Sequence, residues 1–323
     1  MRRILLALAV AACAVALAQV DLRGEIELAT DAAASGARRA QAGWTIAARL
    51  AVDVDLAPAS VHLVLDPSVR FGATVAGEPG LTEAFALATL RDADVSVGLE
   101  RLPLETARLS VPYGVESVDR RGIRRGVWGA RADYYQDGRR WRAAVFLDPR
   151  SERLAPLVGV RANFGSFELE ARALFPGELV VGLGGSGLVG DLVVYGEAWL
   201  LTDPWEARAA LGVTGSLRDG GWTIEGGYLA PAGGLHVADL AGVPPPVPRP
   251  ALNAQLAWAL DAFGDRSLTL GAGAAFDPDA VRTRLSAGYG ASADDRAVNV
   301  SLVAALGPEP AALNLNLSVR HFF

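Results

Sequence analysis

The sequence predicts an all-β fold, a transmembrane antiparallel up-and-down β-barrel of about 16 to 18 strands. Three observations predict it. Most of the chain divides into segments of about ten residues with alternating apolar and polar side chains, the period of a strand. Apolar residues make up 51% of the chain, yet no stretch beyond the first residues suits a spanning helix. A protein that crosses a bilayer without helices needs a closed barrel, because its backbone polar groups must all be paired.

The N-terminal residues have the pattern of a secretory signal peptide. Met1-Arg2-Arg3 is a basic start, residues 4–17 are apolar, and Ala16-Leu17-Ala18 is a small-residue cleavage site. We expect residues 1–18 to be the signal peptide and residues 19–323 to be the barrel. The single cysteine, Cys13, also ends a run typical of a lipoprotein cleavage box, so lipid attachment there is the competing interpretation.

Composition argues against a nucleic-acid-binding protein. The formal net charge is −6 and the chain contains no lysine. Removal of the signal peptide would take away Arg2 and Arg3 and make the charge more negative still. A general nucleic-acid binder needs a basic surface, so we expect no nucleic-acid partner.

Alternation is clearest in four segments. In residues 44–55, 167–172, 281–289 and 313–323, apolar side chains occupy one face and polar side chains the other. A helix with this order would carry charge all around its surface, so a strand is the better prediction. Alternation is weaker in residues 81–90 and 178–187, and the expected strand boundaries there are less well defined.

The connections between segments alternate in length. Long connections at 31–42, 66–80, 103–126, 148–156 and 231–250 follow odd-numbered strands, and even-numbered strands end in tight turns such as 91–94 and 136–139. An antiparallel barrel has long loops on the outer side and short turns on the inner side. An even number of strands also places both chain ends on the inner side.

Aromatic residues fall at the two ends of the expected strands. At the outer rim we expect Trp44, Trp128, Phe175, Trp205, Tyr228 and Phe276, and at the inner rim Trp141, Phe167, Trp222, Tyr289 and Phe323. Two such belts are typical of a barrel in contact with a lipid bilayer. The alternative, aromatic rings filling a sandwich core, predicts rings near strand centres instead.

The polar faces carry charges of both signs. The expected channel-lining residues are Arg49, Asp53, Arg131, Asp133, Arg142, Arg161, Glu168, Glu170, Arg172, Arg208, Arg282, Arg284 and Arg320. A water-filled lumen solvates such groups, whereas a dry core does not. The alternative is a plug of paired arginines and carboxylates that conducts nothing. Because neither sign dominates, ion selectivity is not assigned.

The last eleven residues, LNLNLSVRHFF, alternate without a break and end on phenylalanine. This segment resembles the C-terminal strand of bacterial outer-membrane β-barrels. The resemblance implies location in the cell outer membrane, a lipid bilayer as surroundings, and recognition by the barrel-assembly machinery. On the same resemblance, Leu315, Leu317, Val319 and Phe323 form the assembly signal.

Residues 103–126 resemble the third loop of general porins in position and size. That resemblance implies a loop folded into the barrel, and a surface loop is the alternative. The expected constriction residues are Glu105, Arg108, Glu116, Asp119, Arg120, Arg121, Arg124 and Arg125. The proline-rich segment within 230–250 is expected to be an exposed loop.

The histidines give little support to an enzyme. The three are His62, His236 and His321, and no spacing typical of a catalytic triad or metal site accompanies them. We expect no catalytic residue, no metal and no cofactor. The predicted function is a porin-like channel for passive diffusion of small hydrophilic solutes, with a homotrimer as a possible assembly. The alternative is a plugged structural or surface-interaction barrel, and a barrel-borne hydrolase is less favoured.

Overall fold

A computed structural model describes residues 19–35, 38–56, 58–71, 76–78, 80–102, 104, 113–115, 117–118, 124–149, 151–202, 205–229, 235–236, 249–260, 265–276, 281–307 and 312–322. The expected signal peptide, residues 1–18, lies outside these ranges, as does Phe323. In the described ranges, no helix has the length and apolar character to cross a membrane.

The chain folds into a closed antiparallel barrel of 18 strands. The wall strands are β1 (Gln19–Ser35), β2 (Arg38–Leu56), β3 (Ala59–Leu65), β6 (Leu81–Leu90), β7 (Ala93–Glu100), β10 (Val127–Gln136), β11 (Arg139–Leu147), β12 (Leu154–Phe164), β13 (Phe167–Leu174), β14 (Val180–Val189), β15 (Leu192–Thr202), β16 (Trp205–Leu217), β17 (Gly220–Leu229), β19 (Arg249–Ala259), β20 (Arg266–Phe276), β21 (Val281–Ala293), β22 (Arg296–Leu306) and β23 (Ala312–Phe322).

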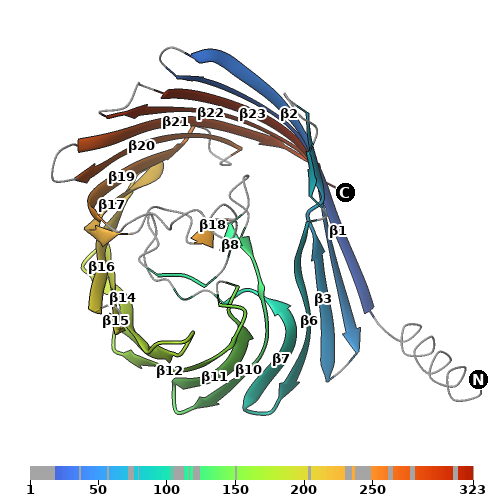
Figure 1. The fold of residues 1–323 in the computed structure, drawn as a ribbon, viewed down its shortest axis with the longest axis vertical. Helices are drawn as coiled ribbons and strands as arrows, with labels where there is room; N and C mark the ends of the chain where they lie inside the picture. The colour runs from blue at the N-terminus through green and yellow to red at the C-terminus, as the bar shows by residue number, and fades with distance from the viewer. Residues whose placement is uncertain are drawn as a thin grey trace, which may run out of the picture.

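The ring closes where the first strand meets the last. β1 pairs with β2 on one side and with β23 on the other, from Glu25↔Phe322 to Ser35↔Ala312. Figure 1 shows the resulting ring, with β1 and the C-terminus side by side. Closure leaves no wall edge with unpaired backbone groups. The predicted fold class is confirmed, at the upper end of its strand number.

Two outer connections differ from expectation because strand pairing continues into them. The loop expected at 31–42 is wrong, since β1 and β2 pair from Asp31↔Gly43 up to Ser35↔Arg38. Within 66–80, β4 (Ser68–Phe71) pairs with β2, and β5 (Ala76–Glu78) pairs with β4. Backbone pairing can continue beyond the part of a strand that lies in the bilayer, so side-chain alternation need not mark the ends of such hairpins.

Short turns join the strands at the opposite end. At the β10–β11 turn, Asp137 and Gly138 both have positive φ, 49° and 72°. Two successive positive φ values are typical of a type I′ hairpin turn, which matches the twist of the flanking strands. The predicted tight turn at 136–139 is confirmed.

The outward face of the wall is apolar. Trp44, Trp128 and Trp205 are 55%, 52% and 75% exposed, and Trp141 and Phe167 are exposed at the other rim. Aliphatic side chains such as Leu183 and Leu211 lie exposed between the two rims. The two aromatic positions predicted at Tyr228 and Phe323 lie outside the described side chains. An apolar band with aromatic rims is the surface that a lipid bilayer requires.

A small second sheet lies inside the ring. It consists of β8 (Ser117–Val118), β9 (Arg124–Arg125) and β18 (Leu235–His236). β8 pairs with β9 in antiparallel fashion and with β18 in parallel. Figure 1 shows β8 and β18 within the barrel outline. The proline-rich segment expected to be an exposed loop lies outside the described residues, apart from Arg249 and Pro250, which begin β19. Upstream of it, Leu235 and His236 pair with β8.

Candidate functional site

A network of ion pairs covers the inward face of β10 and β11. Asp133 lies opposite Arg142 in the register, and the Arg142 guanidinium donates two hydrogen bonds to its carboxylate, at 2.7 and 3.0 Å. Arg131 lies 2.6 Å from Glu100 of β7 and 3.3 Å from Asp133. The Asp133 side chain is 3% exposed. Each charge of this network therefore has a neighbour of opposite sign, which offsets part of the cost of removing it from water.

Glu170 of β13 is the centre of a second group of ion pairs. Its carboxylate lies 2.7 Å from Arg172 and 2.8 Å from Arg161. The Arg140 Nη2 atom is farther away, at 3.6 Å. Arg161 also reaches Glu168, at 3.0 Å. Because three guanidinium groups surround one carboxylate, Glu170 holds neighbouring strands together by charge as well as by backbone hydrogen bonds.

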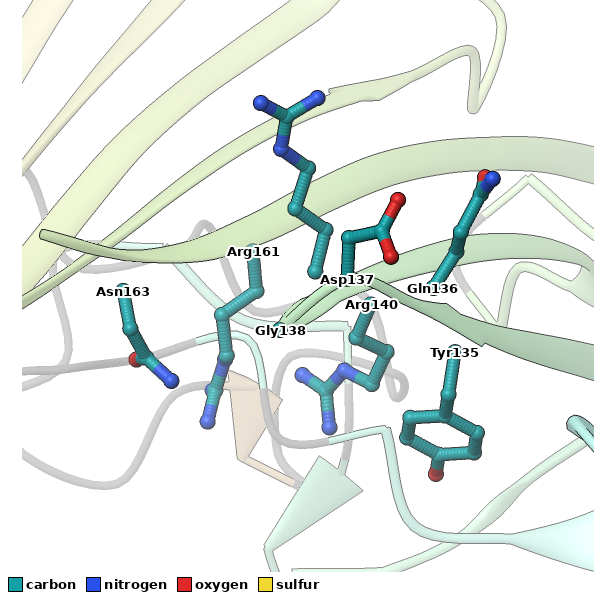
Figure 2. Close-up of a pocket in the computed structure, with 8 residues that line it drawn as sticks. Tyr135, Gln136, Asp137, Gly138, Arg140, Arg161 and Asn163 are labelled. Atoms are coloured by element: carbon teal, nitrogen blue, oxygen red, sulfur yellow. The ribbon is translucent and has the colours of Figure 1, made fainter.

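A cavity of about 410 Å³ lies where β10, β11 and β12 meet their short turns. In Figure 2, Tyr135, Arg140, Arg161 and Asn163 point to one side of the sheet, whereas Gln136 points to the other. The Arg140 Nε atom is buried and has no hydrogen-bond partner. The cavity therefore has guanidinium groups on its inward side, at the inner mouth of the barrel.

An apolar cluster fills the opposite, outer half of this sector. From the wall it contains Val127, Ala144, Phe146, Ala155, Leu157, Leu174, Val180, Trp199 and Leu201. From the connection after β7 it contains Leu102, Leu104, Tyr113 and Val115.

Tyr113 and Trp199 form the aromatic contact between connection and wall. Their ring centroids are 4.9 Å apart, and both side chains are almost fully buried. The guanidinium carbon of Arg172 lies 5.6 Å from the Trp199 ring centroid on another side. The described residues of the 103–126 connection therefore pack against the inner wall, as the third-loop resemblance implied.

The predicted constriction residues are only partly visible in this arrangement. Arg125 belongs to β9 in the inner sheet, and the backbone of Arg124 pairs with Val118. Glu105, Arg108, Glu116, Asp119, Arg120 and Arg121 lie outside the described residues. Their role as a constriction stays a prediction.

The other predicted lining residues are spread around the ring. Arg49 lies 3.9 Å from the buried Asp66. Arg208 lies 2.9 Å from Glu206, and Arg320 lies 3.3 Å from Glu27. Further along the wall, Asp53 pairs with His62, and Arg282 and Arg284 lie on β21. The predicted lining residues of β10 to β13 thus lie together in connected ion pairs, whereas those on the other strands lie in separate places around the ring.

Sequence reasoning missed the inward aromatic residues. Tyr195 and Trp199 of β15 are buried, and the Tyr195 hydroxyl donates to Glu225 at 2.9 Å. Both faces of β15 are largely apolar, so alternation alone did not show which face turns inward. The inward Glu197 between the two rings was the available signal, because a charged side chain does not face lipid.

Comparisons with known proteins agree with this architecture. No protein-family model and no curated protein matches the chain. Among solved structures, Pseudomonas aeruginosa OpdQ has a TM-score of 0.67 at 9% identity, covering 94% of this chain and 99% of its own. Acinetobacter baumannii OccAB1 has a TM-score of 0.64 at 8% identity, with 94% and 97% covered.

A third similar structure is that of the outer membrane protein OpdK from Pseudomonas aeruginosa. Its TM-score is 0.59 at 8% identity, with 94% of this chain and 99% of that chain covered. The solved structures are porins of the OprD/Occ type. At this identity the likeness shows that the chain has their barrel fold over nearly its whole length.

Proposed function

We propose that this protein is an outer-membrane channel for passive diffusion of small hydrophilic solutes. The observation that carries the proposal is a closed barrel with an apolar outward face and a charged, hydrogen-bonding inward face. A barrel of this strand number leaves an aqueous passage unless loops fill it. The likeness to outer-membrane porins supports the same function and location.

Under this proposal, the predicted lining residues face the solute path. The paired groups on β10 to β13 form one side of that path. Where the 103–126 connection packs against the outer half of this wall, the passage is narrowed from that side. The proposed surroundings are the outer-membrane bilayer, with the barrel-assembly machinery as assembly partner and a homotrimer as a possible state.

Transport is better supported than catalysis. His62, on which a hydrolase interpretation rests, pairs with Asp53 at 2.5 Å, and its ring centroid lies 5.0 Å from that of Phe85. This arrangement fixes the imidazole between two wall strands. A hydrolase would lose activity on His62→Ala, and we expect the wild-type protein to show no lipid or peptide hydrolysis.

Planar-bilayer recording of the refolded protein tests the channel function. We expect discrete, ohmic conductance steps in potassium chloride. A closed trace at every voltage would favour the second candidate, a plugged barrel. The specific observation that favours that candidate is the inner sheet of β8, β9 and β18, which occupies part of the lumen.

A further inference from the structure

The wall from β19 to β23 has an inward face of uncharged polar side chains. On these strands Leu252, Leu270, Leu285, Leu302 and Leu315 face outward and are 38–50% exposed. The side chains that alternate with them turn inward. The polar uncharged members of that inward set are Asn253, Gln255, Ser267, Thr269, Ser286, Ser292, Asn299, Ser301, Asn314, Asn316 and Ser318.

The strand register brings these groups together in rows. Asn299 lies opposite Ser318, and Ser301 lies opposite Asn316. Directly opposed side chains on antiparallel strands are about 5 Å apart at Cβ. On β22 and β23 amides and hydroxyls therefore face each other in two rows, and within this wall the polar side chains of β19 to β21 lie opposite small or apolar residues.

Glycines on the neighbouring strands leave space beside the amides. A Cβ added to Gly273 would lie 2.5 Å from the Asn253 Oδ1 atom, and one added to Gly290 would lie 3.0 Å from the Asn299 Oδ1 atom. The amide oxygens thus lie along the wall over glycine backbone. Larger side chains at these glycine positions would displace the amides from the wall.

Most of the hydrogen-bonding capacity of this surface is unused. Ser292 donates to the Asp265 carbonyl oxygen at 3.4 Å, and Ser318 is buried. In the described part of the chain, none of the other nine side chains makes a hydrogen bond to another protein group. On β10 to β13, by contrast, the carboxylates of Asp133 and Glu170 are occupied by arginines. Most of the uncharged donors and acceptors of β19 to β23 are therefore open to a passing solute, whereas these two carboxylates are not.

Charge on this wall is sparse. The strands β20 to β23 contain no aspartate or glutamate. Arg320 is paired with Glu27 of β1. Arg284 lies between Gly273 and Ala305 in the register. Its planar guanidinium can donate to two neighbouring hydroxyl oxygens at once.

We propose that the inner surface of β19 to β23 binds uncharged polyhydroxylated solutes, such as sugars and polyols, along the diffusion path. The inference rests on the proposed channel function and assigns its substrate class. Amides and hydroxyls each offer both donors and acceptors, which is what a polyol presents in return. A cationic solute must give up hydration, and β19 to β23 carry no carboxylate in its place. Arg282, Arg284 and Arg320 are the cations on this face that an anionic solute would meet, so an anion is the competitor that the test must include.

Uptake into proteoliposomes tests the substrate class. The probes are radiolabelled sorbitol, gluconate and glucosamine, which have similar size and are neutral, anionic and cationic. We expect sorbitol to be taken up several-fold faster than either charged solute. Equal rates would overturn the inference and leave a channel that selects by size, and fastest gluconate uptake would overturn it in favour of arginine-controlled selectivity. Absence of uptake for all three would overturn the channel function itself.

A matched pair of variants connects the effect to this wall. Asn299→Leu combined with Ser301→Ala removes two unused hydrogen-bonding groups, and we expect sorbitol uptake to fall about threefold to tenfold. The control is Thr214→Val, because the Thr214 hydroxyl is already paired with Thr223 at 3.0 Å. Potassium chloride conductance confirms that both variants are folded and open. Equal loss of sorbitol uptake in the variant and the control would contradict the assignment.

Discussion

Gly182 lies directly opposite Trp199 in the β14–β15 register, and the indole ring covers the glycine. A Cβ added to Gly182 would lie 2.4 Å from the Cζ3 atom of Trp199. The ring can lie flat on the inner wall only because this position lacks a side chain. In that position Trp199 supports Tyr113 from the connection after β7. Gly182 therefore helps, through Trp199, to position the connection after β7 that packs inside the lumen.

Gly182→Ala should lower the stability of the folded barrel. The added methyl must displace the Trp199 ring from a closely packed cluster, and overpacking of this kind costs about 1–3 kcal/mol. The measurement is the midpoint of thermal unfolding in detergent. Gly288→Ala is the control, since the nearest atoms to its added Cβ are 3.8 Å away. Equal midpoints for the two variants would show that the contact does not constrain the ring.

Tyr113→Ala should loosen the connection after β7, which we propose narrows the passage. The substitution removes a ring that is 4% exposed and stacked on Trp199, so the inner segment loses its aromatic contact with the wall. We expect larger open-channel current noise and a higher mean conductance in planar bilayers. Tyr134→Ala is the matched control, because Tyr134 is 46% exposed on the outward face. An unchanged current in Tyr113→Ala would mean that this contact does not limit the passage.

Most of the wall could be predicted from the sequence, because lipid on one side and water on the other impose strict alternation. Segments 281–289 and 313–323 illustrate this, because their described residues lie in β21 and β23 in the expected orientation. Where the strands extend beyond the bilayer, water lies on both faces, and apolar and polar side chains no longer need to alternate. The pairing of Ser35 with Arg38 follows from backbone hydrogen bonding alone, so the sequence pattern there resembles a loop.

The inner packing could not be predicted for a different reason. The contact of Tyr113 with Trp199 joins residues far apart in the chain, and neither position carries a local signal for it. The pairing of Ser117 with Leu235 likewise depends on two connections meeting inside the closed ring. The charged residues of β10 to β13 were identified by alternation, but their mutual pairing requires the strand register.

Phe323→Ser should reduce assembly in cells without changing the finished channel. The C-terminal strand resembles an assembly signal, and its apolar positions Leu315, Leu317 and Val319 face outward. We expect less folded protein in outer-membrane fractions, scored by heat-modifiable electrophoretic migration. Protein refolded in detergent should keep wild-type conductance. Arg296→Ser, at an exposed turn, is the control, and equal loss in both variants would contradict a specific role for Phe323.

Glu170→Gln should destabilise the barrel and shift its ion selectivity toward anions. The Glu170 side chain is 6% exposed and is shared by Arg161 and Arg172, with Arg140 farther away. Its neutralisation leaves these guanidinium groups without their common carboxylate, and removal of one partner of a buried pair costs about 3–5 kcal/mol. Denaturant unfolding measures the loss of stability. The reversal potential in a salt gradient measures the change in selectivity.

Glu168→Gln separates this effect from a general loss of negative charge. The Glu168 side chain is 40% exposed and pairs with Arg161, at 3.0 Å. Exposed pairs contribute about 1 kcal/mol or less, so the unfolding curve should move little. Each variant removes one negative charge from the lumen, at neighbouring inward positions of β13. If Glu168→Gln lowered stability as much as Glu170→Gln, the shared carboxylate would not be the group that holds these strands together.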